Sequence, residues 1–191
     1  MNALEQEAGE VAGGLRRRDP ALIDYLIEQY RFRLFRYLLM LTGQRQEAED
    51  LFQETWIRVL EKGHLYKERW KFETWLFSIA RHLAIDYRRR RHPESLDALL
   101  EPVDTRRPLE LEDTVSSSSF EQAFQGEEAK RVATALAHLP ASYREVLTLR
   151  FHEDLELEEI AHIVDSPLST VKSRLYRGLE MLREWLKDIY A

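Results

Sequence analysis

The chain of 191 residues contains no cysteine, only seven glycines and only six prolines. Without cysteine, neither a disulfide framework nor a thiolate metal site can form, and nothing indicates an oxidising compartment. The scarcity of glycine and proline leaves long stretches free to be helical, so we expect an all-α protein. Residues 1–14 lack the apolar core of a signal peptide, and no stretch approaches the ~20 apolar residues of a membrane span. The sequence therefore predicts a cytoplasmic protein without membrane insertion.

The formal net charge is −6, but the acidic residues are concentrated in one part of the chain. The stretch 94–128 holds ten acidic residues and two arginines, a net charge of −8 that leaves +2 for the remainder. Prolines and a run of four serines lie in the same region. This composition is typical of an extended or disordered connection. We therefore predict two small helical domains, residues 1–92 and 126–191, joined by a flexible acidic linker at 93–125.

Residues 157–177 have the pattern of a helix, a tight turn and a second helix. The buried face of the first helix is formed by apolar residues at helical spacing: Leu157, Ile160, Ala161 and Val164. Asp165 can take the left-handed conformation of a turn, and Pro167 discourages the preceding residue from staying helical. Ser169 is expected to cap the second helix. The core stripe of that helix is predicted to be Val171, Leu175, Leu179, Leu182 and Leu186.

The outward face of this second helix is polar and basic, which suits the major groove of DNA. Its residues are Ser169, Thr170, Lys172, Ser173, Arg174, Tyr176 and Arg177. Two amphipathic helices joined by a short turn are also common in all-helical proteins, and basic faces are often only solvated. This motif alone therefore leaves DNA binding and simple packing both open.

Three helices are predicted in the N-terminal half. The first begins at Asp19-Pro20, a capping residue followed by a proline suited to the first turn, and ends near Thr42-Gly43. The second spans roughly 46–62, and Gly63 ends it. Its buried face is predicted to be Ala48, Leu51, Phe52, Thr55 and Val59, which turns Asp50, Gln53, Glu54 and Arg58 toward solvent or a partner. The third begins at Phe72 and carries Trp75, Leu76, Ile79, Leu83 and Tyr87 at core spacing.

The third helix ends in four consecutive arginines, 88–91, which must wrap around more than one helical face. Such a run is a phosphate-binding footprint, although a helix C-terminus also favours positive charge. In the preceding loop, Tyr66 and Trp70 are interleaved with basic residues, a pattern that can hold unstacked bases of a single strand. Both aromatic residues can equally pack inside the domain, so their role stays open, whereas Phe72, Trp75 and Leu76 are expected to fill the core.

Three motifs, taken in order, make the chain resemble the extracytoplasmic-function (ECF) sigma factors of bacterial RNA polymerase, in the sigma-70 family. Residues 47–56 are similar to the helix with which sigma factors grip the polymerase clamp. Residues 72–89 are similar to the helix that recognises the promoter −10 element. Leu139-Pro140 with Tyr143 to Leu147, followed by residues 159–161 and 169–175, resemble the domain that reads the −35 element.

The resemblance implies a non-enzymatic transcription initiation factor that binds core RNA polymerase, recognises −35 and −10 DNA and opens the strands. The residues it implies for polymerase binding are Asp50, Leu51, Phe52, Gln53 and Glu54. Those implied for the −10 element are Tyr66, Trp70, Lys71, Arg81, His82, Arg88, Arg89 and Arg90, and the outward face listed above would read the −35 element. Expected partners are core polymerase, double-stranded promoter DNA with its melted strand, and an anti-sigma factor. No cofactor or metal is expected.

Two departures from the family pattern are visible. His82 stands where many relatives have Asn, and Asp165 replaces the usual glycine of the turn. Because Asp adopts positive φ less easily than glycine, this turn is the weaker part of the motif.

Two other classes of protein share some of these features. A polymerase-independent helix-turn-helix regulator would use the same C-terminal helices, but it would not explain the N-terminal domain. A helical metal enzyme is suggested by the Glu-x-x-His pairs Glu61/His64 and Glu159/His162, which resemble those of di-iron bundles. Gly63 interrupts the first pair, and the second pair points away from the apolar face of its own helix, whereas bundle ligands must point inward.

Overall fold

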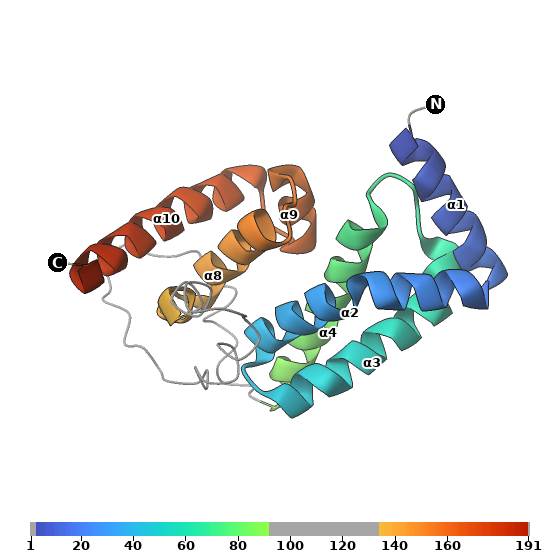
Figure 1. The fold of residues 1–191 in the computed structure, drawn as a ribbon, viewed down its shortest axis with the longest axis horizontal. Coiled ribbons are helices and arrows are strands. Elements are labelled where there is room, and N and C mark those ends of the chain that lie inside the picture. The colour runs from blue at the N-terminus through green and yellow to red at the C-terminus, as the bar shows by residue number, and fades with distance from the viewer. Residues whose placement is uncertain (1–2, 92–133, 191) are drawn as a thin grey trace.

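A computed structural model describes residues 3–91 and 134–190 of the chain. All regular elements within these residues are helical, which confirms the all-α class (Figure 1). None of these helices is both long and apolar enough to cross a membrane. The predicted linker at 93–125 lies outside the described residues.

Four α-helices and one short 3-10 turn form the N-terminal domain. In chain order they are α1 (Ala3–Arg17), α2 (Pro20–Thr42), α3 (Arg45–Lys62), η1 (Gly63–Leu65) and α4 (Phe72–Arg91). Helices α2, α3 and α4 pack against one another around a core that includes Leu34, Leu38, Leu51, Leu76 and Phe77. The three helices predicted for this half therefore start and stop within about one residue of their expected limits.

Local capping chemistry sets the limits of α2. The Asp19 carboxylate accepts a hydrogen bond from the backbone N–H of Ala21 at 3.0 Å, and Pro20 occupies the first turn. At the other end, Gly43 adopts a left-handed conformation with φ of 72°, and its N–H donates to the Leu39 carbonyl at 2.8 Å. Both predicted signals are confirmed. Gly63 also ends α3, but it keeps right-handed angles and leads directly into η1.

Helix α1 is an element that sequence reasoning did not assign. Its residues Val11, Ala12 and Leu15 are buried, and the helix packs on η1 and α2. A Cβ atom added to Gly63 would lie 3.1 Å from Leu15 Cβ, so the glycine allows α1 to approach closely. Helix α1 therefore supports the start of the loop between α3 and α4.

The described part of the C-terminal domain includes the α-helices α8 (Ala141–Leu147), α9 (Leu157–Ile163) and α10 (Leu168–Tyr190). The π-helical turn η2 (Thr148–His152) follows α8 directly. Ile160, Ile163 and Val164 of the α9 segment are buried, and α10 packs against both α8 and α9. The helix-turn-helix predicted from residues 157–177 is therefore confirmed.

The turn between α9 and α10 relies on one residue with positive φ. Asp165 has a φ of 47°, the left-handed conformation predicted for it. Ser169 was expected to cap α10, and this prediction was wrong. The Pro167 carbonyl instead accepts hydrogen bonds from the N–H groups of Thr170 and Val171, so Ser169 already lies inside the helix.

The predicted buried stripe of α10 is observed in part, because Leu182 and Leu186 are half-buried and Leu179 is exposed. Val171 and Leu175 are buried as expected, but Leu179 is 38% exposed and Gly178 is buried instead. A Cβ atom on Gly178 would lie 3.0 Å from Leu147 Cδ1. Because α8 and α10 meet at this glycine, the leucine beside it is turned toward solvent.

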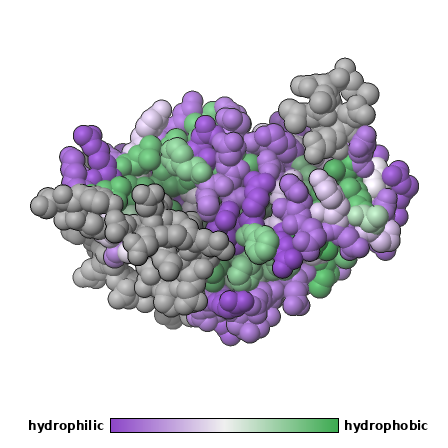
Figure 2. Space-filling view, in the orientation of Figure 1, coloured by the Kyte–Doolittle hydropathy of each residue, from purple (hydrophilic) through white to green (hydrophobic). Residues whose placement is uncertain are grey.

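The two domains pack against each other along one side. Helix α4 contacts α9, and α2 contacts α8 (Figure 1). In the view of Figure 2 the surface across the middle of the molecule is largely hydrophilic, with smaller hydrophobic patches on either side. Interfaces between domains of one chain are often polar and able to open. The residues at this junction therefore decide which candidate surfaces are accessible.

Candidate polymerase and nucleic-acid interfaces

The predicted polymerase surface lies on α3 and is open to solvent. Asp50 and Gln53 are exposed, whereas Leu51 is buried in the core. Phe52 is half-buried and makes an edge-on contact with Trp56. Glu54 is half-buried and pairs with Arg58 at 3.1 Å. The helical phase predicted for these five residues is thus the one observed.

Sequence reasoning missed two apolar residues that extend this surface. Ile57 is 47% exposed and Leu60 is 41% exposed, and their spacing places them close to the exposed face of α3. Exposed apolar side chains rimmed by polar ones are typical of protein-binding surfaces. The signal was present in the sequence as two apolar residues outside the buried stripe.

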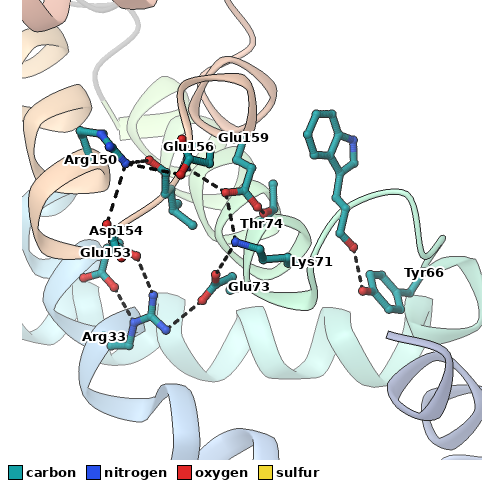
Figure 3. A network of polar contacts seen from close by, with 12 residues as sticks. Arg33, Tyr66, Lys71, Glu73, Thr74, Arg150, Glu153, Asp154, Glu156 and Glu159 are labelled. Carbon is teal, nitrogen blue, oxygen red and sulfur yellow. Dashed lines mark hydrogen bonds and ion pairs between the residues drawn. The ribbon is translucent and has the colours of Figure 1, made fainter. Parts of the chain in front are cut away.

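The loop from Gly63 to Lys71 is fixed from inside the N-terminal domain. Tyr66 is only 2% exposed, and its ring lies against the rings of Phe72 and Trp75. Its hydroxyl donates a hydrogen bond to the Trp70 carbonyl at 2.8 Å (Figure 3). Of the two alternatives left open for Tyr66, packing inside the domain is the one observed. Its ring is therefore closed to bases in this arrangement.

Trp70 and Lys71 contact the C-terminal domain. The Trp70 ring stacks on the His162 ring with centroids 4.9 Å apart and planes 13° from parallel. Lys71 Nζ lies 3.6 Å from Glu159 Oε2 and 4.0 Å from Glu73 Oε1 (Figure 3). Burial, followed by the positive charge of Arg69 and the neighbouring His82, lowers the pKa of His162. The side chain is therefore favoured in its neutral form while it stacks on Trp70.

Arg81 is buried at the same junction. Its Nε donates to Glu145 Oε1 at 2.8 Å, and the Tyr37 hydroxyl donates to the same oxygen at 2.8 Å. Burial alone would lower the pKa of Arg81, but Glu145, together with Tyr37 and Asp165, more than offsets it, so that pKa is raised. Burial and Glu145 raise the pKa of Tyr37 well above its ordinary value. Glu145 thus holds the side chains of Arg81 and Tyr37 inside the junction, and Arg81 cannot reach DNA in this arrangement.

The arginines at the end of α4 wrap around the helix as predicted. Arg88 is half-buried, and burial lowers its pKa. Arg89 and Arg90 are exposed, and Arg91 is ion-paired with Glu47 of α3. The exposed His82 forms a 2.6 Å hydrogen bond through Nδ1 with the Ser78 carbonyl. A basic surface therefore remains open beyond the junction.

The predicted −35 face on α10 is accessible. Its exposed residues are Ser169, Lys172, Ser173, Tyr176 and Arg177, and its half-buried ones are Thr170 and Arg174. Arg174 Nη1 lies 3.5 Å from Ser166 Oγ, so the turn helps to orient this guanidinium group. The predicted −35 face is thus open in an arrangement that covers part of the surface predicted to contact the −10 element.

Three glutamates of the C-terminal domain form contacts with the N-terminal domain. They are Glu145, Glu153 and Glu159, each at most 6% exposed. Sequence reasoning did not predict these contacts. Glu153 accepts from Arg33 Nε at 2.7 Å and from Arg36 Nη2 at 2.9 Å, and its carbonyl accepts from Arg33 Nη2 at 3.0 Å. Burial lowers the pKa of Arg33, but Glu153 and Glu73 more than offset it, so that pKa is raised.

The contacts of Glu159 explain why the second Glu-x-x-His pair, Glu159/His162, is not arranged as a metal site. Its carboxylate accepts a hydrogen bond from Thr74 Oγ1 at 2.9 Å and from the Glu156 N–H at 2.9 Å (Figure 3). It points away from the apolar face of α9, as predicted, but into the other domain. Across residues 3–91 and 134–190, no group of three His, Cys, Asp or Glu side chains is placed to hold a metal ion.

Comparison with known proteins identifies both domains. The family model "Sigma-70 region 2" matches residues 26–94, and "Sigma-70, region 4" matches residues 129–182. The relatives include the ECF RNA polymerase sigma factor SigW of Bacillus subtilis, which is 31% identical over 167 residues, 86% of this chain and 88% of SigW. The sigma factor SigM of the same organism is 33% identical over 173 residues, covering 88% of this chain and 94% of SigM. The chain belongs to the ECF sigma factors.

Solved structures share the fold of this sigma factor. CnrH in complex with the cytosolic domain of CnrY superposes with a TM-score of 0.63 at 18% identity, covering 98% of this chain and 99% of CnrH. RpoE in complex with the anti-sigma factor NepR, from Bartonella quintana, gives a TM-score of 0.62 at 23% identity, covering 86% and 97% of the two chains. The region 2 match begins inside α2, so α1 lies outside it. The region 4 match covers α8, α9 and most of α10.

Proposed function

We propose that the chain is a transcription initiation factor that binds core RNA polymerase and directs it to specific promoters by recognising −35 and −10 DNA and opening the strands. The observation that carries this proposal is the order of the two matches, region 2 before region 4, on two helical domains. A protein that only regulates through a helix-turn-helix has no need of the first domain. RNA synthesis belongs to the polymerase, so we assign no catalytic role to this chain.

The division of labour follows the proposed domains. Residues 1–92 bind the polymerase clamp and the −10 element, 126–191 read the −35 element, and 93–125 connect them. Each domain binds its own DNA element with modest affinity. Polymerase fixes their separation and so raises the effective concentration of the second contact. Two weak contacts then give one specific complex.

Each surface has its own supporting geometry. The α3 face presents Asp50 and Gln53 to a partner and is extended by Ile57 and Leu60. The α10 face presents serine, lysine, arginine and tyrosine side chains that fit a major groove. For the −10 element we retain Trp70, Lys71, Arg81, His82 and Arg88 to Arg90 as contact residues. Tyr66 acts from inside the domain by fixing the loop that carries Trp70 and Lys71.

Partners and location follow from the same function. A factor that works on polymerase and promoter DNA acts in the cytoplasm. We also propose that an anti-sigma factor binds this chain. The Bartonella quintana sigma factor RpoE, which shares the fold, was solved in complex with the anti-sigma factor NepR, and CnrH was solved in complex with the cytosolic domain of CnrY.

The direct test is reconstitution with purified core polymerase. We expect the chain to co-elute with core polymerase in gel filtration, and the mixture to start RNA synthesis at a defined position on a cognate promoter. Core polymerase alone is the control. Failure to co-elute, together with no promoter-specific transcript, would leave the polymerase-independent regulator as the better account.

A further inference from the structure

Helix α1 ends in three consecutive arginines, and the fold places them beside the loop between α3 and α4. Helix α1 packs on η1, which begins that loop (Figure 1). Arg16 Nη2 forms an ion pair with Glu68 Oε1 of the loop at 3.5 Å. The next two residues, Arg17 and Arg18, are exposed. The end of α1 and the loop therefore form one continuous surface.

This surface is strongly basic, although the chain as a whole is acidic. Residues 16–18 and 62–71 hold seven basic residues and one acidic residue, a net charge of +6, whereas the formal net charge of the chain is −6. The acidic residue, Glu68, is already paired with Arg16. In the part of the chain that the structure describes, no carboxylate forms an ion pair with the four exposed cations Arg17, Arg18, Lys67 and Arg69. We call these four side chains the α1-loop surface.

The backbone at Arg18 indicates that its side chain has a role outside the helix. Arg18 follows the last residue of α1 and has a φ of 53°, a left-handed conformation in which glycine is the usual residue. Its N–H donates to the Leu15 carbonyl at 3.2 Å. A helix C-terminus favours positive charge, but Arg16 and Arg17 already supply it. An arginine therefore stands where glycine would avoid backbone strain.

Single-stranded DNA suits the α1-loop surface better than a duplex or an acidic protein. The loop continues into Trp70, whose ring stacks on the His162 ring with planes 13° from parallel, so its face accepts a planar group. A row of cations next to such a ring is the pattern with which proteins bind single strands without sequence preference. The region 2 match begins at residue 26, after α1, so the family match does not assign this surface.

We propose that the α1-loop surface binds backbone phosphates of the melted promoter strand, next to the segment that the proposed −10 residues contact. The inference rests on the proposed function, which supplies the identity of the strand. Helix α1 then has two tasks: its apolar side supports the loop from below, and its terminal arginines extend the DNA contact beyond the loop.

The salt dependence of binding gives the size of the effect. Each phosphate neutralised on a single strand contributes ~0.7 to the slope of log K against log salt concentration. Arg17 and Arg18 together should therefore contribute ~1.4 to that slope. A purely structural role for the two arginines would change the stability of the domain and leave the slope as it is.

The variant R17Q/R18Q tests the proposal. It removes two charges, keeps polar side chains, and leaves the ion pair of Arg16 with Glu68 in place. The matched control is R183Q/K187Q, which removes the same two charges from exposed positions of α10 outside the −35 face. A second variant, R18G, removes one guanidinium group while relieving the left-handed backbone, so it separates charge from stability.

The measurement uses the full chain and a labelled oligo-dT strand of about 12 nucleotides, followed by anisotropy across a salt series. A duplex of the same length is titrated in parallel. Circular dichroism and chemical denaturation check that each variant keeps its helices and its stability.

We expect the magnitude of the slope to fall by ~1.4 in R17Q/R18Q and to stay unchanged in the control. In R18G it should fall by ~0.7, and the denaturation midpoint should not decrease. Three results would overturn the proposal: an unchanged slope in R17Q/R18Q, an equal fall in the control, or a loss of duplex affinity by the same factor as the loss of single-strand affinity.

A separate arm keeps this inference distinct from the proposed function. The Kd for core polymerase should be the same for R17Q/R18Q and the unmodified chain. Weaker polymerase binding with an unchanged salt slope would assign the surface to an acidic protein and overturn the proposal. If the slope falls but the unmodified chain does not co-elute with polymerase, the α1-loop surface stands and the proposed function fails. If co-elution succeeds and the slope does not fall, the function stands and the α1-loop surface fails.

Discussion

The exposed face of α3 gives the sharpest test of the polymerase interface. The variant Q53A/E54A removes two polar side chains from this face and leaves the buried anchor Leu51 in place. Gln53 is exposed, and the ion pair of Glu54 with Arg58 spans 3.1 Å between side chains that are each 40% exposed. An exposed pair of this kind on a helix contributes only ~0.3–0.5 kcal/mol, and alanine regains part of that through helix propensity.

The change in unfolding free energy should therefore stay within about 0.5 kcal/mol. Two contact residues of a protein interface, by contrast, typically carry ~1–3 kcal/mol, which raises the Kd for core polymerase by about 5- to 150-fold. In this variant the Kd for core polymerase should therefore rise while the unfolding free energy stays nearly unchanged.

The assay is titration of labelled chain with core polymerase, accompanied by chemical denaturation of each variant. The matched control is Glu28→Ala on α2, which breaks a similar exposed pair with Arg31 at 3.1 Å. We expect the control to leave the Kd unchanged. An unchanged Kd in Q53A/E54A, with the fold intact, would refute the assignment of this face to polymerase.

Three further predictions concern readout, pH and stability. If Arg174 contacts a guanine through both of its terminal nitrogens, Arg174→Ala should relax the preference at one base pair by ~1–3 kcal/mol in a selection on randomised −35 sequences. Lys172→Ala should instead weaken binding to all sequences alike. A base preference in Arg174→Ala that equals that of the unmodified chain would contradict direct readout by Arg174. Burial at the domain junction lowers the pKa of His162, so a form with separated domains binds the proton more tightly; as pH falls through about 6.5, energy transfer between dyes on cysteines introduced at the exposed positions Lys62 and Glu180 should drop, and His162→Gln should reduce that response. Leu15 is only 3% exposed, so Leu15→Ala should cost ~2–5 kcal/mol in denaturant unfolding of the N-terminal domain, and a cost below about 0.5 kcal/mol would show that α1 does not support this domain.

Features decided by local chemistry could be predicted from the sequence. The cap at Asp19, the left-handed Gly43 and the left-handed Asp165 each depend on a few neighbouring residues. The helical phase of α3 likewise follows from apolar spacing, and with it the separation of the buried Leu51 from the exposed Gln53. Family motifs then linked these helices to a function.

Features decided by tertiary contact could not be predicted in the same way. Leu179 has core spacing, but the close approach of α8 at Gly178 turns it outward. Glu153 stands next to Asp154 and has the pattern of a solvated residue, yet its partner Arg33 lies 120 residues earlier in the chain. Tyr66 could pack inside or bind bases until the neighbouring rings of Phe72 and Trp75 were placed.

Footprinting of one cognate promoter tests the central claim most directly. The chain alone, core polymerase alone and the two together are compared on the same DNA. We predict protection of the −35 and −10 elements only in the mixture, because polymerase sets the distance between the two domains. Tight, sequence-specific protection by the chain alone would contradict this account and favour a regulator that acts without polymerase.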